Sequence, residues 1–106
     1  MRVSLLVFRL PPGTPNAEVG KFVKKLYGQA TSSWGGKYTY RRPGLLDGVP
    51  HRKLLRGVVI VQRKDLAKVL AFLGEWNALV EVREIRPTVE DLQFLEKEPS
   101  AHGGGW

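Results

Sequence analysis

The sequence predicts one α+β domain built on an antiparallel sheet, and three observations lead to that prediction. Short apolar runs bounded by proline or glycine are typical of strands, and the clearest of them spans residues 54–62. Two segments instead repeat their apolar residues at the spacing of an amphipathic helix. Strand-type and helix-type segments follow one another in the order β-α-β-β-α-β, with a short helix after them. At 106 residues the chain is the length of a single domain.

The first strand and helix are predicted before residue 28. Residues 2–10 form an apolar run that stops at two prolines and a glycine, which favours a strand buried on both faces. Thr14 before Pro15 is the N-cap and N1 pairing that opens many helices. Gly28 has the residue type preferred just after a helix end. The apolar face of this helix consists of Val19, Phe22, Val23 and Leu26.

The middle of the chain is predicted to be a connector followed by a hairpin. Residues 28–36 form the connector, and 37–42 alternate in the manner of a strand with a solvated face. Turn dipeptides follow, so 43–53 becomes the hairpin loop that leads into the strand at 54–62. Three apolar residues in this loop need a partner surface, which can be their own sheet, a second subunit or a groove; they are Leu45, Leu46 and Val49.

A second helix is predicted to begin near Asp65, and its apolar face consists of Leu66, Val69, Leu70 and Leu73. Gly74 or Asn77 ends it. Residues 78–85 alternate as a strand. Thr88 and Asp91 resemble a capping box, which opens a third helix that runs to about Glu98.

These elements predict a ferredoxin-like split βαβ (βαββαβ) fold, an antiparallel sheet with two helices on one face and a short C-terminal helix. The domain spans 1–98, and 99–106 form a flexible tail. A single sheet of this kind leaves one face open, while its first and third strands are apolar on both sides. We therefore expect a homo-oligomer, most simply a dimer.

Composition excludes several classes of function. The chain has no cysteine, which removes disulfides, thiolate metal sites and a cysteine nucleophile. Nucleotide-loop and hydrolase motifs are absent, the acids of the basic part are widely spaced, and we expect neither a cofactor nor a metal. No apolar run is long enough for a membrane span, and the N-terminus lacks the pattern of a secretory signal, so we expect no membrane partner and a cytoplasmic location. Asn and Gln are scarce in the chain, a composition that is typical of proteins from thermophiles.

Charge is distributed unevenly along the chain. The net charge is +7, yet residues 75–106 alone carry −4, so residues 1–74 are strongly basic. A basic stripe of this kind is typical of a nucleic-acid-binding surface, because lysine and arginine neutralise phosphates. The excess of basic over acidic residues is largest at 37–56, which contain six Lys or Arg and one Asp.

Residues 37–56 are therefore the predicted nucleic-acid-binding region, for DNA or RNA. Arginine outnumbers lysine within 40–56, and its guanidinium binds phosphate with two parallel hydrogen bonds. Tyrosines are interleaved with these cations and can stack on bases, as can Trp34. The candidate residues are Lys37, Tyr38, Tyr40, Arg41, Arg42, Arg52, Lys53 and Arg56.

Two other functions remain open from the sequence. A metal-independent ribonuclease needs a general acid and base with a cation nearby, which His51, Tyr40 and Arg52 could supply. Alternatively, the arginines pair with the acids at 75–98 within one molecule or across a dimer, in an oligomeric protein-interaction or regulatory module.

Overall fold

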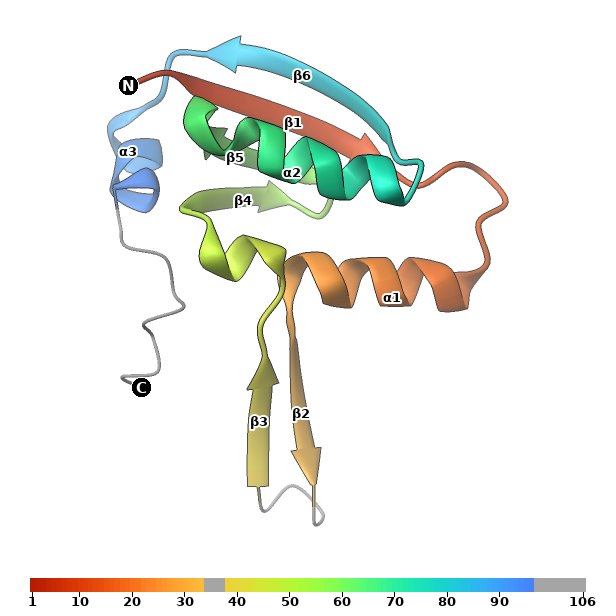
Figure 1. The fold of residues 1–106 in the computed structure, drawn as a ribbon. Coiled ribbons are helices and arrows are strands. Elements are labelled where there is room, and N and C mark those ends of the chain that lie inside the picture. Colours follow the sequence, from red (N-terminus) through yellow and green to blue (C-terminus); the bar gives the residue numbers. More distant parts are fainter. Residues whose placement is uncertain (34–37, 97–106) are drawn as a thin grey trace.

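The computed structural model describes residues 1–33 and 38–96 (Figure 1). Within them, a four-stranded antiparallel sheet has the order β4-β5-β1-β6, and β2 and β3 form a separate two-stranded sheet. The predicted tail at 99–106 lies outside the described residues. The elements are β1 (Val3–Arg9), α1 (Asn16–Tyr27), β2 (Gln29–Ser33), β3 (Tyr38–Arg42), the 3-10 helix η1 (Leu45–Gly48), β4 (His51–Leu55), β5 (Val58–Gln62), α2 (Arg63–Glu75), β6 (Leu79–Ile85) and α3 (Val89–Leu95).

The main core lies between one face of the four-stranded sheet and the helices α1 and α2. Alternate residues of β1 and β5 point to this face, as the two-residue period of a strand requires. They pack against the apolar stripes of both helices that the helical spacing predicts. The buried residues of this main core include Leu6, Phe8, Phe22, Leu26, Val59, Val61, Val69 and Leu73.

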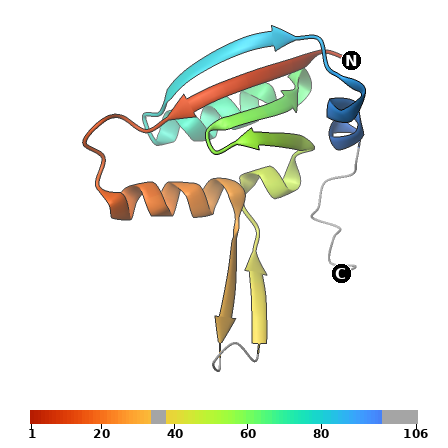
Figure 2. The same ribbon diagram turned by 180° about the vertical axis from the view of Figure 1, so that it is seen from behind.

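The opposite face of the sheet is covered at one end only. Val3 and Ile60 are buried there beneath Leu95 of α3. Figure 2 shows this helix beside one end of the strands. Farther along the same face, Val7 of β1 and Leu79 of β6 stay exposed at 43% and 47%. The sheet therefore has one helix-covered face and one face that is half open.

Several local predictions are confirmed. Both amphipathic helices form, β6 occupies most of 78–85, and Gly28 is the C-cap residue of α1. At α3, the Thr88 hydroxyl accepts the Asp91 backbone N–H at 3.0 Å, and the Asp91 carboxylate accepts the Thr88 N–H at 2.9 Å. This is the predicted capping box. The helix ends at Leu95, three residues before the predicted end.

The predicted connector at 28–36 is wrong, because it contains the strand β2. The strand predicted at 37–42 is real, but as β3 it pairs with β2 and not with 54–62. The register sets Tyr40 opposite Thr31 and Arg42 opposite Gln29. The paired strands β2 and β3 form a two-stranded ribbon, called the ribbon below. Figure 1 shows it projecting from the body of the molecule below α1.

The hairpin loop predicted at 43–53 is also wrong. This segment folds as η1 followed by most of β4. The hairpin of the main sheet comes later, where Arg56 and Gly57 join β4 to β5. Gly57 has φ +87°, a value that tight hairpin turns need and that glycine adopts at little cost. The apolar run 54–62 is therefore two strands.

Leu45, Leu46 and Val49 find their partner surface inside the molecule. Leu46 and Val49 are each 2% exposed within the main core, and Leu45 packs against it half-buried. Of the three surfaces open from the sequence, their own domain is the one they use.

Candidate nucleic-acid interface

The base of the β2–β3 ribbon is held by an arginine and an aspartate. The Nη2 group of Arg41 lies 2.7 Å and 2.9 Å from the two carboxylate oxygens of Asp47, and it also donates to the Tyr27 carbonyl oxygen at 3.0 Å. The same carboxylate accepts the Gly44 backbone N–H at 2.7 Å. Asp47 thus joins β3 to η1, and Arg41 joins β3 to the end of α1.

Two glycines cross at this base. Gly28 leads from α1 into β2, and Gly44 leads from β3 into η1. A Cβ atom added to Gly44 would meet the Gly28 nitrogen and would lie 2.6 Å from the Leu26 carbonyl oxygen. Only residues without a side chain allow the two backbones to pass this closely. The ribbon therefore leaves and re-enters the body at one point.

The predicted residues on the ribbon lie along β3. Tyr38 and Tyr40 pair in the backbone register with Ser33 and Thr31 of β2. Arg42, at the end of β3, is exposed and has no carboxylate partner among the described residues. Lys37 and Trp34 lie outside the described residues.

Neighbouring residues of β4 point to opposite faces of the sheet. His51 and Lys53 pair with Val61 and Val59, whose side chains lie in the main core, while Arg52 pairs with Ile60 on the α3 face. His51 Nδ1 lies 2.8 Å from the Val49 carbonyl oxygen. Tyr40 belongs to the separate ribbon sheet. The structure therefore does not bring the three ribonuclease candidates to one face.

Arg52 is engaged by the acids of α3. Its Nη1 donates to Asp91 at 2.7 Å, its Nη2 lies 3.6 Å from Glu90, and its guanidinium carbon lies 5.1 Å from the centroid of the Phe94 ring. These acids belong to the segment that the sequence offered as an internal partner for the arginines. For Arg52 that pairing is observed.

Two further predicted cations, Lys53 and Arg56, lie near Tyr27. Lys53 Nζ lies 4.2 Å from the centroid of its ring, a cation–π contact. The Tyr27 hydroxyl accepts the Gly57 backbone N–H at 3.0 Å. Burial raises the pKa of this hydroxyl, although the Gly57 hydrogen bond and the Arg56 charge oppose the shift. Lys53 and Arg56 therefore meet at the end of α1.

The stability of the protein should depend on pH through Asp91. The hydrogen bond from the Thr88 backbone lowers the pKa of this carboxyl, and Arg52 contributes in the same direction. The unfolded chain therefore takes up the proton first, and the stabilisation present above about pH 4 is lost as the pH falls further. Urea unfolding of wild type and Asp91→Asn from pH 7 to pH 2.5 measures this. We expect the difference between the two proteins to shrink with falling pH, and a constant difference would contradict the assignment.

The basic charge is concentrated in one part of the fold. Residues 21–56 hold nine Lys or Arg and one Asp, a net charge of +8, while the rest of the chain sums to −1. They supply most of α1, the ribbon, η1 and β4, which lie together in Figures 1 and 2. Sequence reasoning missed the contribution of α1, namely Lys21, Lys24 and Lys25. Their position on the polar side of an amphipathic helix beside the predicted region was the available signal.

Neither a metal-ligand group nor a membrane-spanning helix is found among the described residues. Among residues 1–33 and 38–96, no group of three His, Asp or Glu side chains could hold a metal ion. None of the helices in these ranges is long and apolar enough to cross a bilayer.

The described chain is thus an α+β protein with a four-stranded antiparallel sheet and three α-helices. Comparisons with protein-family models, with curated proteins and with solved structures found no match.

Proposed function

We propose that the protein binds nucleic acid without cleaving it, through the ribbon and the basic surface at its base. The observation that carries this proposal is the net charge of +8 on residues 21–56 in the part of the fold from which a two-stranded ribbon projects. Phosphate neutralisation supplies most of the affinity of such proteins. A surface that served solubility alone would intersperse acids among the cations.

The shape of the ribbon suits a groove. Its strands have five residues each, so each extends about 16 Å at the usual rise of about 3.3 Å per residue. The major groove of a DNA duplex is about 8.5 Å deep and admits a two-stranded ribbon. The cations at the base would then face the phosphates beside the groove.

The ion pairs at the base divide the candidate residues by role. Arg41 and Arg52 already hold carboxylates, so in this proposal they position β3 and α3. The cations of residues 21–56 without a carboxylate partner in the described part of the chain supply the phosphate contacts, namely Lys24, Lys25, Arg42, Lys53 and Arg56.

Removing one such contact should weaken binding by a measurable amount. We expect Arg42→Gln to lower the affinity for a 20-base-pair duplex about five- to tenfold and to reduce the slope of log K against log salt by about 1. Fluorescence anisotropy between about 50 and 200 mM NaCl gives both values. A single strand of the same sequence, measured in parallel, distinguishes groove binding from single-strand binding.

Arg86→Gln is the matched control, because Arg86 is an exposed arginine just after β6, in the acidic part of the chain. Its affinity should stay within twofold of wild type. The proposal fails if the wild-type slope is near zero or if the two variants weaken binding equally.

We further propose that the main sheet with α1 and α2 is a ferredoxin-like split βαβ unit. In chain order its strands are β1, β4, β5 and β6, and the spatial order β4-β5-β1-β6 with antiparallel neighbours supports this. The ribbon and η1 are then insertions between the first helix and the second strand of the unit.

The open half of the sheet supports a second proposal, a homodimer. Leu55, Val58 and Val7 follow one another across three strands in register. On β6 the row continues to Glu81, and Leu79, opposite Arg9, lies two residues from it on the same face. Leu55 is 69% exposed. A second copy covering this face would bury these side chains.

We expect Leu79→Glu to shift a dimer to monomer in sedimentation velocity, because a carboxylate would be buried at the interface. Val89→Glu, on the exposed side of α3, is the control and should leave the dimer intact. A wild-type protein that sediments as a monomer at high micromolar concentration would overturn the proposal.

A further inference from the structure

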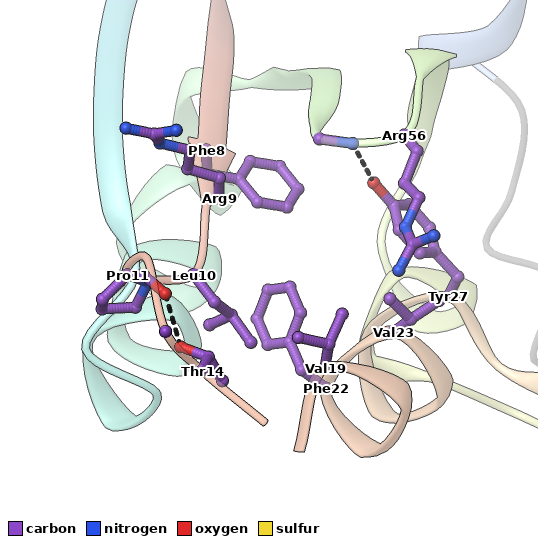
Figure 3. A pocket seen from close by; sticks show the side chains of 12 residues that line it. Phe8, Arg9, Leu10, Pro11, Thr14, Val19, Phe22, Val23, Tyr27 and Arg56 are labelled. Carbon is purple, nitrogen blue, oxygen red and sulfur yellow. Dashed lines mark hydrogen bonds between the residues drawn. The ribbon is translucent and has the colours of Figure 1, made fainter. Parts of the chain in front are cut away.

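A pocket of about 320 Å³ lies where the end of β1, α1 and the β4–β5 turn meet (Figure 3). Its walls are mainly apolar, and the apolar residues that line it include Phe8, Leu10, Val19, Phe22 and Val23. The Phe8 and Phe22 rings meet edge to face, with their centroids 6.1 Å apart. Pockets of about 300 Å³ or more with apolar walls are typical small-molecule sites.

The Arg56 guanidinium and the Tyr27 hydroxyl are the two polar groups that matter for a ligand in this pocket. Figure 3 shows the Arg56 guanidinium beside Tyr27 and Val23, while the Arg9 guanidinium points away from the two phenylalanine rings. Arg56 has no carboxylate partner among the described residues. The pocket therefore combines an apolar interior with an uncompensated cation.

Tyr27 adds a hydrogen-bond donor to that cation. Its oxygen accepts the Gly57 N–H, while its own O–H has no acceptor in the described part of the chain. Since burial raises the pKa of the hydroxyl, it stays protonated at neutral pH and can donate. A carboxylate has two oxygens, one for this O–H and one for the Arg56 guanidinium.

We propose that this pocket binds a small organic carboxylate with an apolar body. The apolar part would lie against Phe8, Phe22 and Val23, and the carboxylate would lie between Arg56 and Tyr27. Of the two arginines that line the pocket, Arg9 points its guanidinium away from the rings in Figure 3, which leaves Arg56 as the cation beside Tyr27. A phosphate or sulfate head would call for more than this one cation. Arg56 is shared with the proposed nucleic-acid surface, but the pocket proposal does not depend on nucleic-acid binding, because the ligand would lie in the cavity and its binding is measured without nucleic acid.

Octanoate and 1-octanol are suitable probes, because they share a chain and differ in charge. Isothermal titration gives affinities, and amide NMR shifts locate the site. We expect octanoate to shift the amides of α1 and of the β4–β5 turn. Arg56→Gln should weaken octanoate about tenfold and leave 1-octanol within twofold. Tyr27→Phe should weaken octanoate about threefold to fivefold.

A second type of variant fills the cavity. Val19 is only half-buried, so Val19→Phe should fold while narrowing the pocket, and it should weaken octanoate and octanol together. Arg86→Gln is the charge control and should match wild type. The proposal is overturned if octanoate does not bind, if its shifts map elsewhere, or if Arg56→Gln and Arg86→Gln bind it equally well. Duplex binding by the same variants is scored separately.

Discussion

Replacing Gly44 with alanine is expected to lower the free energy of unfolding by about 3 kcal/mol. The new methyl group would overlap the Gly28 nitrogen and the Leu26 carbonyl oxygen, which are backbone atoms and cannot rotate away. The end of α1 and the start of η1 must then separate, although Leu26 and Leu46 are buried on either side. The midpoint of thermal unfolding should fall by roughly 15 °C.

Gly48→Ala is the matched control for this experiment. It makes the same chemical change four residues later, where an added Cβ meets nothing within 4 Å and φ is not positive. Its stability should lie within about 0.5 kcal/mol of wild type. Equal stability losses in the two variants, measured by urea and by heat, would show that the crossing is not tight.

Replacing Arg52 with alanine is expected to cost about 2 kcal/mol, the second largest effect we predict. Asp91 is only 6% exposed and would lose its closest cationic partner. Phe94 would lose the guanidinium beside its ring. The loss should fall on the α3 end of the sheet, so hydrogen exchange of α3 amides should accelerate more than that of α2 amides.

Arg83→Ala provides the comparison. Arg83 also lies on the sheet, but its ion pair with Glu81 is about 70% exposed on both sides. Exposed pairs of this kind contribute little, so the change should stay below about 0.5 kcal/mol. If the two arginine variants lose the same stability, the Arg52 cluster contributes no more than a surface pair.

The sequence predicts elements whose cause is local. The capping box at Thr88 and Asp91 involves atoms three residues apart, so residue types alone reveal it. The apolar stripes of α1 and α2 and the alternation of β6 are equally local patterns. These account for the correct position of both long helices, of the first and last strands, and of the short C-terminal helix.

Elements that depend on pairing were missed. The residues of β2, QATSS, carry no apolar alternation, and their strand exists because β3 pairs with them. Gly57 splits an apolar run, and its role follows from a positive φ that the composition of the run does not reveal. Without these two facts, the chain from 43 to 53 looks like a loop.

The sequence predicts where basic residues are concentrated, but it does not predict which arginines are already paired with carboxylates. Arg52 and Asp91 are 39 residues apart, so only the tertiary fold shows that this arginine is already paired. Arg41 and Asp47 are six residues apart, yet their contact depends on the crossing of two chain segments. Arg42, next to Arg41, remains without a carboxylate partner in the described part of the molecule.

The crossing of Gly28 and Gly44 has a consequence for the evolution and engineering of the chain. Because the backbone leaves and returns at nearly the same place, residues 29–43 form an insertion. The strands of the main sheet lie outside it. A change in its length or sequence need not alter the connectivity of the body. A different ribbon inserted at this point would therefore leave the order of strands in the main sheet unchanged.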